Sequence, residues 1–221
     1  MRKVIVGAMV SMDDVMQAPG GPAEDPTGGF KFGGWTAPLA DTDPVFGKEI
    51  GRLLGQSYDL LLGRRTYDIF AAYWPYAEGD IAKQFNRVTK YVVTRKGADL
   101  TWNGSVALRD GARDVAKLKQ EDGPPLVTQG STELVHSLLA AGLVDEIRTF
   151  TLPVLLGKGK RLFDENSQPS GLKLTHSAVS PNGLIAVIYV RDGEVRTATV
   201  GGAKEPSAAE LARREKLKRE A

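Results

Sequence analysis

The order of apolar runs and helix signals constrains the fold of this chain more than any other feature. Short runs of the length expected for buried strands alternate with segments that carry helix start and stop signals. Asp43-Pro44 is typical of an N-cap followed by proline at the first helical position, and Gly142 is typical of a helix end. From residue 172 the pattern changes, because two apolar runs flank Pro181-Asn182-Gly183, a strong hairpin signal. The order predicts an α/β protein of three layers with a mixed, mostly parallel sheet that ends in an antiparallel hairpin.

The expected elements follow from these signals. We predict strands over 3–10, 58–62, 90–94, 126–128 and 147–155, hairpin strands over 172–180 and 184–191, and helices over 44–56, 64–72, 111–120 and 131–141. The Gly/Pro-rich stretch 19–34 is too irregular for any element, and a long loop inside a compact domain is often functional. We therefore expect one domain over 1–195 and a charged, helical or disordered tail over 196–221.

Composition narrows the classes of protein. The chain of 221 residues has no cysteine, which excludes disulfides and thiolate metal sites, and its two histidines cannot build a multi-histidine metal site. The first residues do not resemble a secretory leader and no run of about 18 apolar residues occurs, so we expect a cytoplasmic protein without a membrane span. Residues 203–221 hold six basic and four acidic side chains, which leaves 23 of each in the body. The folded part therefore has no excess positive charge of the kind that indicates nucleic-acid binding.

The first candidate binding turn is Gly63-Arg64-Arg65-Thr66, where the second apolar run ends and a helix begins. Glycine lets the backbone approach a ligand, and the start of a helix presents free N–H groups and a positive dipole end. Arg64 and Arg65 would suit a phosphate monoester such as the 2′-phosphate of NADP. The alternative is a solvated arginine pair beside an ordinary capping threonine.

Two further strand ends carry similar residues. Thr94 and Arg95 stand at the end of one strand, and the run Gln129-Gly130-Ser131-Thr132-Glu133 follows another. In that run Gly130 permits close approach, while Ser131 and Thr132 would cap the helix and leave its first N–H groups for a pyrophosphate. Each turn alone is equally compatible with simple capping. Their joint position at strand ends predicts a phosphate-binding edge of the sheet, although G-x-G-x-x-G is absent.

These residues resemble the dihydrofolate reductase superfamily over about residues 3–191. The G-R-R-T turn with Tyr67 is similar to the cofactor motif of that superfamily, and the most specific stretches are 129–134, 142–148 and 153–163. The resemblance is closest to stand-alone dihydrofolate reductase family proteins, which resemble the C-terminal reductase domain of bifunctional riboflavin-biosynthesis enzymes. It implies a dihydrofolate reductase-like fold.

The resemblance also implies a function. The protein would be an NADPH-dependent reductase that transfers hydride to a pterin- or pyrimidine-like heterocycle, and it would form a homodimer. NADPH contacts would be made by Gly63, Arg64, Arg65, Thr66, Thr94, Arg95, Gln129, Gly130, Ser131, Thr132 and Glu133, with Ala8 near the nicotinamide. The alternative is a non-catalytic member of the same fold that binds a nucleotide or acts through oligomerisation.

The substrate side departs from the relatives. Gly47 stands where dihydrofolate reductases place a helix carboxylate, with Asp43 and Glu49 nearby, and Asp14-Val15 stands where the riboflavin-type reductases have Gly-Lys. The assignment of a folate substrate and that of a phosphoribosyl-pyrimidine substrate are therefore both left undecided by these residues.

Three residues are candidate substrate contacts. Asp13 is the preferred polar contact, with turn capping as its alternative, and Trp35 and Phe46 would stack on a heterocycle or else belong to the core. The segment Gly157-Lys158-Gly159-Lys160-Arg161 looks like a phosphate loop, but the resemblance makes it a tight turn.

Overall fold

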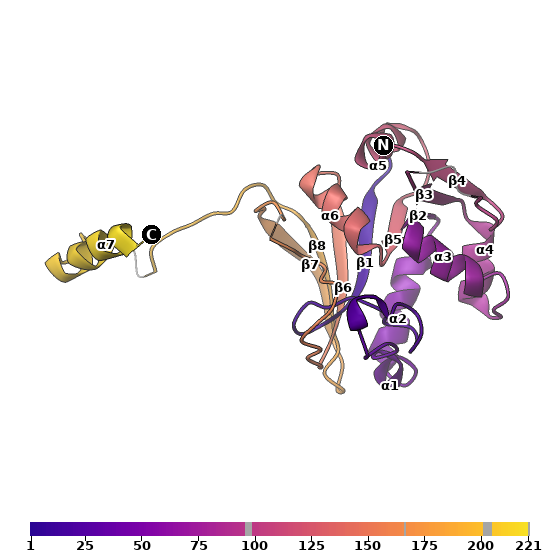
Figure 1. The fold of residues 1–221 in the computed structure, drawn as a ribbon, viewed down its shortest axis with the longest axis horizontal. Coiled ribbons are helices and arrows are strands. Elements are labelled where there is room, and N and C mark those ends of the chain that lie inside the picture. Colours follow the sequence, from indigo (N-terminus) through magenta and orange to yellow (C-terminus); the bar gives the residue numbers. More distant parts are fainter. Residues whose placement is uncertain (96–98, 166, 201–204, 221) are drawn as a thin grey trace.

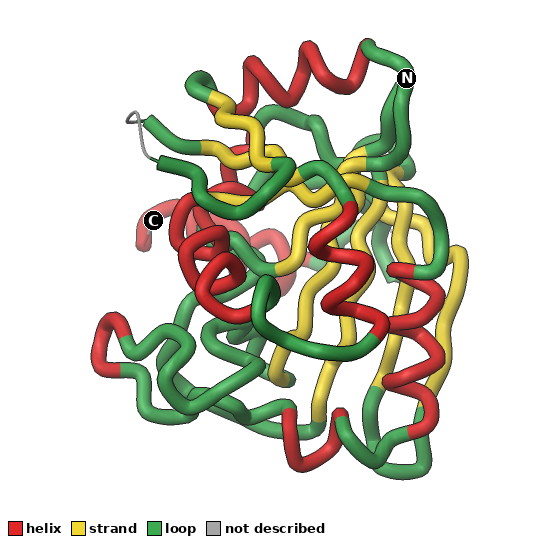
Figure 2. The backbone as a smooth tube through the Cα atoms, turned by 90° about the vertical axis from the view of Figure 1, so that its right-hand side faces the viewer, coloured by secondary structure: helices red, strands yellow, loops and turns green. Residues whose placement is uncertain are grey.

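The computed structural model describes residues 1–95, 99–165, 167–200 and 205–220, and its described strands form one eight-stranded sheet in the order β4-β3-β2-β5-β1-β6-β8-β7 (Figures 1 and 2). Neighbours from β4 to β6 are parallel, whereas β6, β8 and β7 are antiparallel. This confirms the predicted mixed sheet with a C-terminal hairpin. The strands are β1 (Val4–Ser11), β2 (Asp59–Gly63), β3 (Lys90–Val93), β4 (Ser105–Leu108), β5 (Leu126–Gln129), β6 (Glu146–Leu152), β7 (Leu172–Val179) and β8 (Ile185–Arg191).

Helices cover the two faces of the sheet and complete the three layers. Buried residues of α5 and α6 pack on one face, and those of α2, α3 and α4 pack on the other. A tertiary requirement explains this pattern, because parallel strands must be shielded on both faces. The helices are α1 (Ala37–Ala40), α2 (Pro44–Leu54), α3 (Arg64–Tyr73), α4 (Asp80–Arg87), α5 (Gly111–Gln120), α6 (Thr132–Ala140) and α7 (Ala208–Glu220), with a short 3₁₀ turn η1 (Thr27–Gly29).

Helix α2 forms where its capping residues predict it. The Asp43 carboxylate accepts the backbone N–H groups of Val45 at 2.9 Å and Phe46 at 3.0 Å, which satisfies two of the free donors at the helix start. Leu53 and Leu54 are buried against the sheet. By contrast, β4, α1 and α4 were not predicted, because these elements are four to eight residues long, shorter than the stretch over which periodicity is read.

The two irregular segments differ in packing. Residues 19–34 contain only η1 and fold against the body, where Phe30 packs with Val15 and Ala18. Helix α7 lies within the predicted tail and away from the body in Figure 1, and the division into domain and tail stays a prediction. The predicted tail also includes residues 201–204 and 221, which lie outside the described residues. None of the described helices is both long and apolar enough to cross a membrane.

Lys90 at the start of β3 is an unusual core residue, because its side chain is completely buried. Its Nζ donates to the carbonyl oxygens of Asn86 at 2.8 Å and Asn103 at 2.9 Å and lies 4.5 Å from the centre of the Trp102 ring. Burial nevertheless penalises the charged ammonium and lowers the pKa of Lys90 to about 8.

This pKa makes stability depend on pH in the alkaline range. The unfolded chain has a lysine pKa of about 10.4, so between pH 8 and that value it binds more protons at this site than the folded protein does. The contribution of Lys90 to the free energy of unfolding should therefore rise with pH. We expect wild type to gain about 1 to 2 kcal/mol relative to Lys90→Met between pH 7.5 and 9.5, measured by urea denaturation. Parallel pH profiles for the two proteins would contradict this assignment.

Candidate functional site

A cleft of about 1300 Å³ opens at the carboxyl ends of the parallel strands. Strand β1 pairs with β5 only as far as the partners Gly7 and Gln129, whereas its remaining residues pair with β6 alone. The two central strands therefore part at Gly7 and Ala8, and both residues line the cleft. In open α/β sheets ligands bind at such a point.

The two predicted binding turns meet in this cleft. The backbone N–H of Gly63 donates to the Ser131 Oγ at 2.9 Å, which joins the end of β2 to the start of α6. Gly130 has a φ of 77°, and a Cβ there would lie 3.7 Å from the Thr66 side chain. All residues of both turns, from 63 to 66 and from 129 to 133, line the cleft. The predicted common edge is present, and the contacts with NADPH stay a prediction.

The starts of three helices face the cleft without side-chain caps. The N-caps are Gly63 for α3, Asp110 for α5 and Ser131 for α6, and none of them bonds its own helix through a side chain. We expected Ser131 to cap α6, and this was wrong: the residue has a φ of 67° and its hydroxyl accepts from Gly63 instead. The first N–H groups of these helices are thus left without side-chain caps beside a cavity, which suits an anion such as phosphate.

The cationic side chains at this end differ in how they are engaged. Arg64 Nε donates to both carboxylate oxygens of Asp68, at 2.8 and 2.9 Å, and this bond raises the pKa of Arg64. Arg65 and Arg95 are exposed and line the cleft, and the described part of the chain gives neither of them a carboxylate partner. Of the predicted pair, Arg65 therefore has the freer guanidinium. Thr94 also lines the cleft but is buried.

Asp13 lies outside the residues that line the cleft. Its carboxylate accepts bonds from the Ser11 hydroxyl at 2.7 Å and from the backbone N–H groups of Leu156 at 3.0 Å and Gly157 at 2.8 Å. The Ser11 bond, followed by the backbone bonds, holds the pKa of Asp13 well below its usual value. The geometry therefore favours the turn-capping alternative over contact with a substrate.

The two aromatic candidates, Trp35 and Phe46, differ in their position relative to the cleft. Trp35 does not line the cleft: its indole Nε1 donates to the Gln17 carbonyl at 2.8 Å, and its ring packs against the cluster of Val15, Ala18 and Phe30. Trp35 is therefore not in the expected stacking position. Its indole instead binds the backbone that leads into the long loop. Phe46 lines the cleft and packs against Phe150 with 5.6 Å between ring centres.

Neither acidic residue of the α2 region faces the cleft. Asp43 caps the helix, as described above. Glu49 is buried, and its Oε2 contacts Arg52 Nε at 2.9 Å and His176 Nε2 at 3.0 Å. These contacts direct its carboxylate towards the C-terminal hairpin. Helix α2 thus supplies apolar cleft residues (Phe46, Ile50 and Leu53) and no carboxylate to the cleft.

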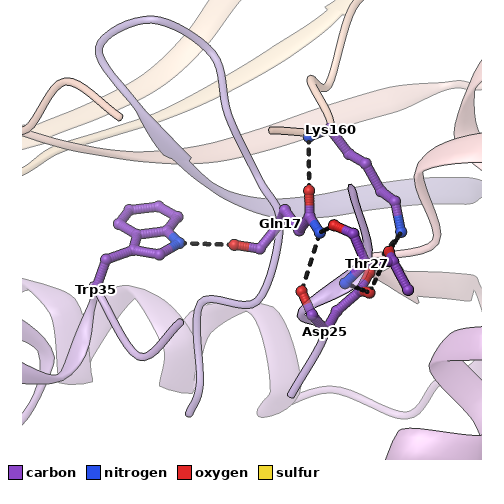
Figure 3. Close-up of polar contacts among 5 residues, drawn as sticks. All are labelled: Gln17, Asp25, Thr27, Trp35 and Lys160. Atoms are coloured by element: carbon purple, nitrogen blue, oxygen red, sulfur yellow. Dashed lines mark hydrogen bonds and ion pairs between the residues drawn. The ribbon is translucent and has the colours of Figure 1, made fainter. Parts of the chain in front are cut away.

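Sequence reasoning missed a polar cluster at the opposite end of the cleft, formed by Gln17, Asp25, Thr27 and Lys160 (Figure 3). Gln17 Nε2 donates to the carbonyl oxygens of Asp25 and Thr27, both at 2.9 Å, and its Oε1 accepts the Lys160 backbone N–H at 3.1 Å. The Lys160 ammonium contacts the Asp25 carboxylate and the Thr27 hydroxyl. The segment 157–161 is thus a turn, with positive φ at Gly157 and Gly159, and it also brings a cation to the cleft.

A comparison with protein families agrees with this geometry. The family described as the RibD C-terminal domain matches residues 2–186 of the chain. The chain belongs to the RibD C-terminal domain family. The match includes both binding turns and the polar cluster, so the whole cleft lies in the part that the family covers.

The chain is also similar to other proteins. YyaP of Bacillus subtilis (strain 168) is 27% identical over 202 residues, which span 87% of this chain and 96% of YyaP. YwjB of the same organism is 30% identical over 119 residues, which span 52% of this chain and 63% of YwjB.

Solved structures share the fold at low sequence identity. A dihydrofolate reductase of Enterococcus faecalis, in complex with NADP(H) and RAB-propyl, has a TM-score of 0.57 at 13% identity, over 86% of this chain and 96% of that chain. A pyrimidine reductase-like protein of Corynebacterium diphtheriae has a TM-score of 0.56 at 13% identity, over 89% of this chain and 93% of that chain. These likenesses confirm the dihydrofolate reductase-like fold of this member of the RibD C-terminal domain family.

Proposed function

We propose that the protein is an NADPH-dependent reductase of a pterin- or pyrimidine-like heterocycle. The observation that carries the proposal is the gathering of three uncapped helix starts around one cleft, with Arg65 exposed at its rim. Membership of the RibD C-terminal domain family supports a reductase of this kind. The two fold relatives described above, a dihydrofolate reductase and a pyrimidine reductase-like protein, support a heterocyclic substrate.

The residues of the two binding turns fit the cofactor. The free N–H groups at the starts of α3 and α6 suit a pyrophosphate, and Gly130 leaves room for its close approach. Arg65, aided by Arg95, suits the 2′-phosphate, since guanidinium groups form strong bonds with phosphate oxygens. When bound, NADPH supplies a hydride. Gly7 and Ala8 line the cleft where the central strands part and would form the floor at the reacting centre.

The test is a titration of the purified protein with NADPH, NADP, NADH and NAD. We expect the phosphorylated forms to bind about tenfold or more tightly than the others, because a bond to a charged group contributes roughly 1.5 to 3 kcal/mol. Absence of binding, or equal affinity for all four, would contradict the proposal. Turnover is then screened with dihydrofolate and aminopyrimidines, and tight NADPH binding without turnover of any would favour the non-catalytic alternative. The homodimer and the cytoplasmic location stay predictions.

A further inference from the structure

The two ends of the cleft differ in charge. The end around α3, α5 and α6 is lined by four arginines and three carboxylates, so its balance is basic (Arg64, Arg65, Arg95, Arg109, Asp68, Asp110, Glu133). The end formed by the long loop, α1 and the turn at 157–161 is lined by Glu24, Asp25 and Asp41 against the single ammonium of Lys160. A phosphate group is therefore favoured at the first end and repelled at the second.

Of the three carboxylates at the acidic end, Asp25 is the one placed beside a cation. Glu24 Oε2 is occupied by the backbone N–H groups of Gly20 and Gly21, and Asp41 is exposed at the end of α1. The Asp25 side chain is 10% exposed and contacts the Lys160 ammonium. This partly buried ion pair lines the cleft, where a bound ligand would meet it.

The Asp25–Lys160 pair has one hydrogen-bond acceptor and one donor that no contact among the described residues uses. Asp25 Oδ1 accepts from the Thr27 N–H at 3.2 Å and the Thr27 hydroxyl at 2.6 Å, whereas Oδ2 accepts only from Lys160 within the described part of the chain. The Lys160 ammonium donates to Asp25 and, at 3.0 Å, to the Thr27 hydroxyl oxygen. A carboxylate oxygen has two lone pairs and an ammonium has three N–H bonds. One lone pair of Oδ2 and one N–H of Lys160 thus remain on these two neighbouring atoms.

The cluster is held rigidly in this arrangement. Gln17 uses both ends of its amide to tie the Asp25 and Thr27 backbone to the Lys160 backbone, and Trp35 holds the Gln17 carbonyl, as Figure 3 shows. Burial acts to raise the pKa of Asp25, but the bonds from Lys160 and Thr27 outweigh it and hold the pKa below its usual value. The carboxylate is therefore an ionised acceptor at neutral pH, fixed before a ligand arrives.

We propose that Asp25 and Lys160 together bind the cyclic amide edge of an uncharged heterocycle, in which an N–H and a C=O are adjacent. Oδ2 of Asp25 would accept from the ring N–H, and Lys160 would donate to the neighbouring carbonyl oxygen. The inference deepens the proposed function and rests on it, because it names the substrate class of the same cleft. The acidic lining adds that this substrate carries no phosphate.

The test compares ligand pairs on the wild-type protein by calorimetry, with and without NADPH. Aminouracil should bind about tenfold or more tightly than its di-N-methylated analogue, which lacks the ring N–H. Loss of a hydrogen bond to a charged group lowers the binding affinity by at least about this factor. Uridine should bind at least as tightly as uridine monophosphate. Tighter binding of the monophosphate, or equal binding of aminouracil and its methylated analogue, would overturn the inference.

Variants then locate the effect. Asp25→Asn and Lys160→Met should each lower the affinity for aminouracil about tenfold and reduce its advantage over the methylated analogue. Asp41→Asn is the matched control, since it removes one negative charge from the same end without touching the pair, and it should preserve that advantage. An equal loss of discrimination in Asp25→Asn and Asp41→Asn would overturn the role of the pair.

Cofactor titration separates this inference from the proposed function. The NADPH affinity of Asp25→Asn should match that of wild type, because Asp25 is not among the predicted cofactor contacts. Failure of NADPH to bind wild type would contradict the proposed function, whereas the aminouracil comparison without NADPH would still decide for or against the Asp25–Lys160 site.

Discussion

Replacement of Arg65 by glutamine should weaken NADPH binding about 10- to 100-fold and change NADH binding by less than about twofold. The exposed guanidinium lies at the start of α3, on the wall of the cleft that also presents the free helix N–H groups. These N–H groups suit the pyrophosphate that both cofactors share. Only the 2′-phosphate distinguishes them, so loss of the arginine should act on NADPH alone. Fluorescence titration of both cofactors measures the difference directly.

Two matched arginine variants test the assignment. Arg64→Gln should have the smaller effect on NADPH, because the Arg64 guanidinium is already bonded to Asp68. Arg196→Gln removes an exposed arginine beyond β8, outside the cleft, and should leave both cofactors unaffected. Equal losses of affinity for NADPH and NADH in Arg65→Gln, or a larger loss of NADPH affinity in Arg64→Gln, would show that Arg65 does not bind the 2′-phosphate.

The sequence predicted the two binding turns and their common edge of the sheet for a physical reason. Binding turns at the ends of parallel strands consist of consecutive residues, so Gly63 to Thr66 and Gln129 to Glu133 can be recognised from local patterns. The sheet order then brings them together without further information. The contact between Gly63 and Ser131 was beyond such reasoning, because the left-handed conformation of Ser131 turns its hydroxyl towards the neighbouring turn.

The opposite end of the cleft could not be predicted in this way. Its polar cluster joins Gln17 and Asp25 to Lys160, a residue 135 positions beyond Asp25, and no periodic pattern connects segments so far apart. Asp13 and Trp35 were attractive candidates because they flank the first strand and the long loop. In the fold both side chains bind backbone groups. Asp13 accepts the N–H groups of Leu156 and Gly157, where the 157–161 turn begins, and Trp35 donates to the Gln17 carbonyl. A loop without regular structure needs such anchors.

Substitution of Gly159 by alanine should cost about 3 kcal/mol or more of the free energy of unfolding. Gly159 has a φ of 145°, and a Cβ there would lie 2.3 Å from Val15 Cγ1 and 3.1 Å from the Phe30 ring. Val15 is fully buried and Phe30 nearly so, and a β-branched side chain in a packed cluster has little freedom to move. Strain and overpacking therefore add at this position. Urea denaturation measures the loss.

Gly157→Ala is the matched control, because it makes the same chemical change two residues earlier. Gly157 also has a positive φ, of 73°, but no atom lies within 4 Å of its added Cβ. It should lose only the conformational part, about 1 to 2 kcal/mol. Equal losses in the two variants would show that contact with Val15 and Phe30 is unimportant at Gly159.

A second substitution and a binding measurement complete the test. Val15→Ala removes the methyl group that meets the new Cβ, so the double variant should be more stable than the two single losses added together predict. Gly159→Ala should also weaken aminouracil binding, because Lys160 follows directly and its place depends on this turn. NADPH binding should persist in the folded variant, since neither Gly159 nor Lys160 is among the predicted cofactor contacts at the starts of α3 and α6. A variant that loses NADPH binding while still folded would show that the two ends of the cleft are not independent.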